Sequence, residues 1–207
     1  EHELDRITSG LMDRPVKGYE QPELEGKIPM IIFSPTVVND GRKIYIASRP
    51  VSFMNSELES FENYDDFKYS GIDFMRFLEL QGSQNLRFLS ALRMSATFPY
   101  ITPNTTLPTE PPIQIMDAGI SDNFGLSDAI RFIFPFRDWI NENTSGIVVV
   151  SIRDSPKVRD IPPTSKQTIV DEFTQPISSV YNNFENFQDI TSDLLIGQAS
   201  EWLTHPV

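Results

Sequence analysis

An aspartate on a short turn, Asp117, is the residue of this chain best suited to chemistry. Residues 113–116 before it form a short apolar run typical of a strand, and Ala118 and Gly119 offer a small-residue turn before a predicted helix. A carboxylate on such a strand-to-helix turn is rigidly aimed and lies near amides that favour negative charge. Such a carboxylate is suited to orienting or deprotonating another side chain or a substrate. The alternative is that Asp117 and Gly119 only form the turn, Gly119 supplying permissive backbone angles.

Few side chains could work with this carboxylate. The chain has no cysteine, and its only two histidines, His2 and His205, lie near the ends of the sequence. A Ser-His-Asp triad, a thiolate nucleophile and a zinc site are therefore disfavoured within this chain. We expect no metal and no cofactor, and any catalysis would use carboxylates and hydroxyls or residues from elsewhere.

Composition indicates a globular protein with a net negative charge. The 207 residues are 39% hydrophobic and 22% charged, with a formal net charge of −12. This charge disfavours nucleic acid and strongly anionic membranes as partners, although local lipid contact stays open. No apolar run approaches the length of about 20 residues that spans a membrane, and the polar opening residues do not form a leader. The compartment cannot be assigned, and residues 1–27 are predicted to be a linker or loosely ordered.

Strand and helix patterns alternate along the rest of the chain, which favours a three-layer α/β architecture. The first pair is a hairpin, in which residues 28–33 and 43–48 are joined by a turn at Asn39-Asp40-Gly41. Further strands are expected at 113–116 and, most clearly, at the β-branched run 146–152.

Helices are expected on either side of these strands. They cover residues 73–81, 84–95 with Ser83 as N-cap, and a third segment beginning after Asp122 or Asn123 as cap. A long apolar stripe between residues 177 and 195 predicts a C-terminal helix that packs on the sheet.

Two segments in order resemble the patatin-like phospholipase family. The first is residues 90–103, a helix that ends in Ser95-Ala96-Thr97-Phe98-Pro99 and a proline-bounded loop. The second is residues 117–123, Asp-Ala-Gly-Ile-Ser-Asp-Asn, which is similar to the D-G-[GA] motif of that family. The paired strands before the first segment and the strand at 147–152 fit the same order. The resemblance covers roughly residues 28–155.

The resemblance implies a lipid acyl hydrolase with a Ser-Asp dyad and no catalytic histidine. Asp117 would be the dyad base, and Ala118, Gly119 and Asn123 would support its loop. Ala118 stands where the family usually has glycine. The family's G-x-S-x-G nucleophile elbow and glycine-rich oxyanion loop are missing. Ser127 comes nearest the elbow, but it follows the aspartate and lies within a predicted helix.

We therefore predict an incomplete patatin-like α/β domain that is inactive alone. Residues 28–155 would form the C-terminal part of the domain, and residues 156–207 a helical segment packing on it. The predicted partners are a lipid or acyl-ester substrate, the N-terminal half of the same domain and a membrane surface touched peripherally. The alternatives are a non-catalytic interaction or lipid-binding module, and a glycosidase that pairs Asp117 with Asp122 or Asp128.

Overall fold

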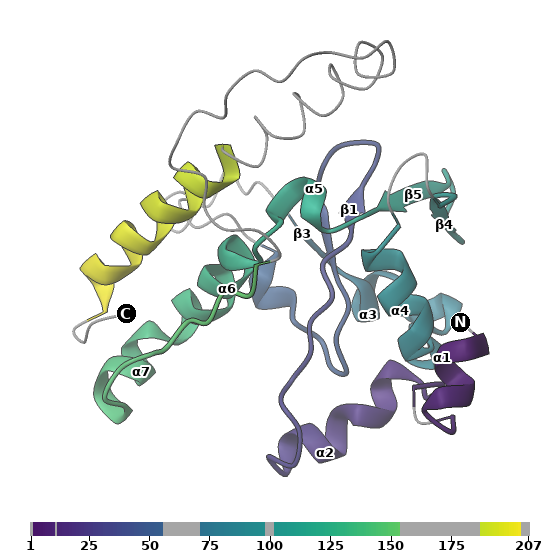
Figure 1. Cartoon of the computed structure of the whole chain (residues 1–207), viewed down its shortest axis with the longest axis horizontal. Coiled ribbons are helices and arrows are strands. Elements are labelled where there is room, and N and C mark those ends of the chain that lie inside the picture. The colour runs from purple at the N-terminus through teal and green to yellow at the C-terminus, as the bar shows by residue number, and fades with distance from the viewer. Residues whose placement is uncertain (1, 11, 56–70, 98–101, 154–186, 204–207) are drawn as a thin grey trace, which may run out of the picture. The chain divides into compact units, whose positions relative to one another are not determined.

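The computed structural model describes residues 2–10, 12–55, 71–97, 102–153 and 187–203 (Figure 1). The chain divides into two compact units, Glu1–Ser121 and Asp122–Val207. The boundary falls inside the segment 28–155, which the sequence suggests is one domain. Residues 56–70, 98–101 and 154–186 lie outside the described part, and so does most of the predicted C-terminal stripe.

The first unit contains a mixed sheet of five short strands. Their order is β3-β2-β1-β5-β4, and only β2 and β3 run parallel. The unit thus has an α/β fold. Its strands are β1 (Thr36–Val37), β2 (Lys43–Tyr45), β3 (Gly71–Asp73), β4 (Thr105–Leu107) and β5 (Ile113–Met116), and its helices are α1 (His2–Ile7), α2 (Glu20–Leu24), α3 (Phe74–Phe77), α4 (Phe88–Ser95) and the 3₁₀ helices η1 (Val16–Tyr19), η2 (Ser52–Met54), η4 (Glu79–Gln81) and η5 (Ser83–Asn85). Helix α5 (Gly119–Asp122) begins in this unit, and its last residue belongs to the second unit.

The core lies between the sheet and helices α3 and α4. Strand residues such as Ile44 and Ile115 are fully buried, and Met94 and Ala91 of α4 pack into the same cluster. Asp73 ends β3 and begins α3, because its carboxylate accepts hydrogen bonds from the amides of Met75 and Arg76. Such capping satisfies amides that a helix leaves unpaired.

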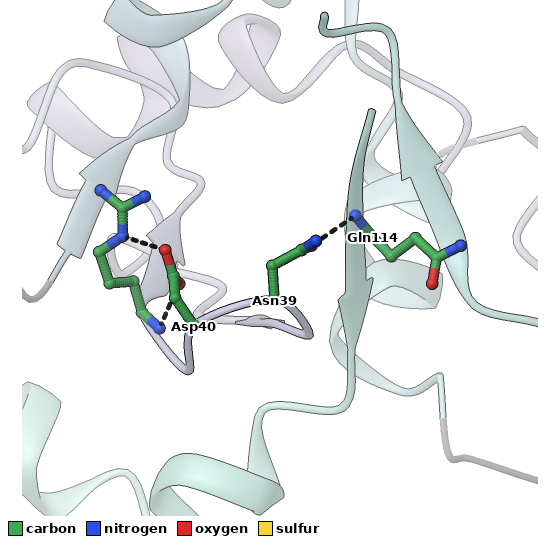
Figure 2. A network of polar contacts seen from close by, with 4 residues as sticks. Asn39, Asp40 and Gln114 are labelled. Carbon is green, nitrogen blue, oxygen red and sulfur yellow. Dashed lines mark hydrogen bonds and ion pairs between the residues drawn. The ribbon is translucent and has the colours of Figure 1, made fainter. Parts of the chain in front are cut away.

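The predicted turn at Asn39-Asp40-Gly41 is present between β1 and β2. Asp40 accepts a hydrogen bond from the Arg42 amide at 3.0 Å and pairs with its guanidinium, while Gly41 takes the positive φ that the turn requires. Figure 2 shows that Asn39 also reaches across to β5, where its side-chain oxygen accepts from the Gln114 amide. The turn is thus linked to the strand that leads to Asp117.

The first strand of this hairpin differs from the prediction. It is Thr36–Val37, whereas residues 28–33 form no strand, and only Phe33 bridges to Ile46. Pro29 lacks an amide to donate to a ladder, and Ile31 is exposed. Residues 1–27, expected to be a loose segment, contain α1, η1 and α2, and Val16 is part of the core.

Ser83 does not cap the helix that follows it, contrary to the prediction. Its hydroxyl donates to the carbonyl oxygen of Met75, and α4 begins later, at Phe88, with Arg87 in the N-cap position. The predicted helix at 73–81 is divided into α3 and η4. The sequence periodicity located these helical segments without giving their ends.

The regular elements of the second unit are helices in the part of the chain that the structure describes. It contains α6 (Leu126–Ile133), η6 (Phe134–Phe136), α7 (Arg137–Asn143) and a helix over residues 187–202, yellow in Figure 1. Both ends of the last helix are fixed within the unit. Arg153 forms two hydrogen bonds with Asp189 near its start, and the Trp202 ring stacks edge-on against Phe134 near its end.

Residues 146–152, predicted to be the clearest strand, are not in a strand. The segment belongs to the second unit, and no ladder within the described residues includes it. Val148, Val150 and Ile152 are 87%, 75% and 90% exposed. Likewise, Phe187, Ile190 and Leu194 of the C-terminal stripe are exposed rather than packed on a sheet. A β-branched run needs neighbouring strands before it can become a buried strand.

Candidate functional site

Asp117 occupies the turn immediately after β5, as the sequence predicts. The strand positions it firmly, because Ile115 is fully buried and β5 pairs with β1 on one side and β4 on the other. The Asp117 side chain itself is only partly buried. The carboxylate therefore directly follows an interior strand while remaining partly accessible to solvent.

The end of α4 holds the backbone of this turn. The Asp117 amide donates to the carbonyl oxygen of Thr97 at 2.8 Å, and the Ala118 amide donates to that of Ser95 at 3.2 Å. Thr97 is completely buried, and its hydroxyl donates to the carbonyl oxygen of Arg93. The two segments that carry the family resemblance, residues 90–103 and 117–123, thus meet at these hydrogen bonds.

The carboxylate of Asp117 has one oxygen engaged and one open. Oδ1 accepts a hydrogen bond from the Gly119 amide at 2.7 Å, the geometry of an Asx turn. Oδ2 receives no hydrogen bond from the residues that the structure describes. Turn formation therefore uses half of the carboxylate and leaves the other half for a partner. Helix α5 has only four residues, so its dipole adds little at this position.

Ala118 and Gly119 support the turn through their backbones. Ala118 accepts a hydrogen bond from the Ser121 amide, and neither Ala118 nor Gly119 has a positive φ. Alanine thus fits where the family usually has glycine, and the permissive angles expected of Gly119 are not used.

Sequence reasoning missed a hydroxyl pair beneath the turn. The hydroxyl oxygens of Thr36 on β1 and Ser121 on α5 lie 2.8 Å apart, and Thr36 is buried. Only the pairing of β1 with β5 brings them together, and no sequence signal predicts that pairing. Ser95 adds another feature, because its buried hydroxyl has no hydrogen-bond partner among the described residues.

Asn123 and the two other candidate acids, Asp122 and Asp128, belong to the second unit. The Asn123 amide donates to the side-chain oxygen of Gln188 at 2.8 Å. Asp122 Oδ2 accepts from the Ser127 hydroxyl at 2.7 Å and from the Asp128 amide at 3.1 Å. The N-cap of α6 is Gly125, contrary to the prediction of Asp122 or Asn123, although the Asp122 carboxylate does accept from an amide of the first turn. Ser127 lies within α6, and its hydroxyl donates to Asp122 at the start of that helix. This structural role accounts for the contact between Ser127 and Asp122 without any catalytic role.

No family model, curated protein or solved structure matches the chain. Among the described residues, no group of three or more histidine, cysteine or acidic side chains could hold a metal ion. None of the described helices has both the length and the apolar character needed to cross a bilayer. The Asp117 turn is therefore the feature of the described structure that bears most directly on function.

Proposed function

We propose that this chain supplies the carboxylate of a Ser-Asp dyad in a lipid acyl hydrolase of the patatin-like type. The carrying observation is Asp117, held after an interior strand by backbone hydrogen bonds to Thr97 and Ser95, with Oδ2 open. In this proposal Oδ2 accepts the proton of a serine hydroxyl supplied by polypeptide outside these 207 residues. The scarcity of histidine in the chain supports a dyad over a triad.

The proposed reaction has two steps. The serine oxygen attacks the ester carbonyl while its proton passes to Asp117, and the alcohol leaves with that proton. Water then attacks the acyl-serine while Asp117 accepts its proton, and that proton passes to the serine oxygen as the acyl–oxygen bond breaks and the fatty acid is released. The substrate is a lipid or another acyl ester, and the enzyme would touch a membrane surface only peripherally. The nucleophile and oxyanion donors would come from the N-terminal half of the same domain.

Hydrolysis of p-nitrophenyl butyrate tests the proposal. The chain alone should be inactive, and a polypeptide that joins it to the sequence encoded before Glu1 should be active. In that longer protein Asp117→Asn should lower kcat by at least about 1,000-fold, because the serine loses its base. Asp138→Asn, which changes an exposed acid of α7, is the matched control and should retain full activity. Activity that survives in Asp117→Asn would overturn the assignment.

One observation favours the second candidate, a non-catalytic interaction module. Val148, Val150 and Ile152 are exposed and lie outside any described strand ladder, which suits pairing with another polypeptide. In that case the longer protein would bind its partner through this segment and would hydrolyse no ester. A fluorophosphonate probe separates the two candidates, because it labels only an activated serine.

A further inference from the structure

A cavity of about 420 Å³ lies in the first unit, away from the Asp117 turn. Its walls come from α3, η5, α4 and β4, and Asp117 is not among the lining residues. The volume is within the range of small-molecule sites, which is about 300–1,000 Å³. The cavity is therefore large enough for a ligand of modest size.

The floor of the cavity is apolar and buried. Phe74 and Leu78 line it from the α3 segment, Met94 from α4 and Leu107 from β4, and all four belong to the hydrophobic core. The Ser83 hydroxyl is satisfied by the carbonyl oxygen of Met75. It therefore stabilises the wall without being left for the ligand. Such a floor favours an aliphatic chain over a polar ligand.

The rim differs sharply from the floor. Polar side chains also line the cavity, namely Gln81, Ser83, Asn85, Ser90, Thr105 and Thr106. Arg93 is the only charged residue among the described residues that line it, and its side chain is exposed. Ser90, Arg93 and Met94 are spaced so that they share one face of α4, and this face joins the floor to the rim. An acyl chain on the floor would thus have its end group near a guanidinium, which binds carboxylates in a planar geometry.

We propose that this cavity binds a medium-chain carboxylate, with its aliphatic chain against the apolar floor and its anionic end at Arg93. The inference rests on the cavity alone and goes beyond the proposed hydrolysis at Asp117. The site carries no acid or nucleophile that acts on the ligand, so it is a binding site. A free fatty acid is the committed ligand, because an esterified chain has no anionic end at that position.

Calorimetric titration of the full 207-residue chain with decanoate, below its micelle concentration, tests the proposal. Decanoate should bind at one site, and hexanoate should bind at least tenfold more weakly, because each methylene contributes about fourfold in affinity. Decanol, which has the chain without the charge, should bind about fivefold more weakly. Equal affinity for decanoate and decanol, or no decanoate binding, would refute the proposal.

Two substitutions localise the binding. Arg93→Gln should weaken decanoate about fivefold and leave decanol unchanged, whereas Arg76→Gln, which changes an exposed arginine of α3 outside the cavity, should have less than a twofold effect. Ser90→Phe should fill the cavity and abolish binding of both ligands. Phenylalanine and serine have similar helix propensities, and circular dichroism checks the fold.

The result also separates this proposal from the hydrolase assignment. Asp117→Asn should bind decanoate with the affinity of the unmodified chain, because Asp117 does not line the cavity. If Asp117→Asn alone loses decanoate, the ligand lies at the Asp117 turn and the cavity assignment fails. If Ser90→Phe and Arg93→Gln both leave decanoate binding unchanged, the ligand binds elsewhere and the assignment also fails.

Discussion

Thr36 and Ser121 share a hydrogen bond between their hydroxyl groups, with 2.8 Å between the two oxygens. Thr36 belongs to β1 and Ser121 to the short helix that follows Asp117. The bond therefore joins the sheet directly to the element that closes the Asp117 turn. Because Thr36 is buried, its hydroxyl depends on this partner for hydrogen bonding.

Thr36→Val should lower the free energy of unfolding by about 1 kcal/mol, because valine keeps the shape and removes the hydroxyl pair. Urea denaturation measures the change. In a double-mutant cycle with Ser121→Ala, the two effects should be non-additive by about 0.5–1 kcal/mol. Thr106→Val, on the exposed side of β4, is the control and should change stability by less than about 0.5 kcal/mol. Fully additive effects would contradict the direct bond.

Ser95→Ala should leave the unfolding free energy unchanged or raise it by up to about 1 kcal/mol. The Ser95 hydroxyl is buried without a partner among the described residues, and removing such a group relieves its desolvation penalty. The carbonyl oxygen that holds Ala118 is unaffected by the substitution. Thermal unfolding measures this effect. A loss above about 1 kcal/mol would mean that the hydroxyl has a partner after all.

Gly71→Ala should destabilise the first unit by about 1–3 kcal/mol. A methyl group at position 71 would overlap the ring of Tyr45, which is fully buried and has no room to move. Gly18→Ala is the matched control, because a methyl group there meets nothing within 4 Å. Equal stability of the two variants in urea would show that the sheet adapts to the added methyl group.

Arg153→Gln should destabilise the helix at residues 187–202. The guanidinium forms two hydrogen bonds with the largely buried Asp189 and lies over the Phe124 ring at 3.8 Å. Removing it takes both of these hydrogen bonds away from a largely buried carboxylate, at a cost of about 2–3 kcal/mol. Hydrogen exchange of the helix amides measures the loss. Arg153→Lys should recover only part of the protection, because lysine lacks the planar fork. Full recovery by lysine would show that charge alone matters.

Val148→Lys combined with Val150→Lys should reduce self-association of the chain without changing its stability by more than about 0.5 kcal/mol. Both side chains are exposed in a β-branched segment, whose composition favours pairing between chains. Light scattering over a range of concentrations measures association. The double threonine variant keeps the β-propensity and should associate more than the lysine variant. Equal association of wild-type and lysine chains would exclude this segment as the contact.

The sequence was most informative where local chemistry decides the structure. The Asn39-Asp40-Gly41 turn and the strand before Asp117 were predictable, because turn residues and a short apolar run act through their immediate neighbours. The start of α6 was located only approximately, because its N-cap is Gly125 and not Asp122 or Asn123. The Asp117 turn needed only small residues after a strand.

The predictions failed where the structure of a segment depends on residues far away in the sequence. Residues 146–152 have the composition of a buried strand, but strand formation needs neighbouring strands to pair with. The apolar run at 28–33 does not form the predicted strand, because Pro29 interrupts ladder pairing. The strand that pairs with β2 begins at Thr36 instead. The bonds from Thr97 and Ser95 to the Asp117 turn also depend on tertiary packing. The proposed role of Asp117 as a base stays a prediction.

The strand order also has a kinetic consequence. The pairing of β5 with β4 joins neighbours in sequence, whereas the pairing of Val37 with Ile115 closes a long loop. Closing long loops costs entropy before the contacts compensate for it, and such contacts slow folding. We expect the β4–β5 hairpin to form early and to dock on β1 later. The position of Asp117 would then be completed only at this late docking step.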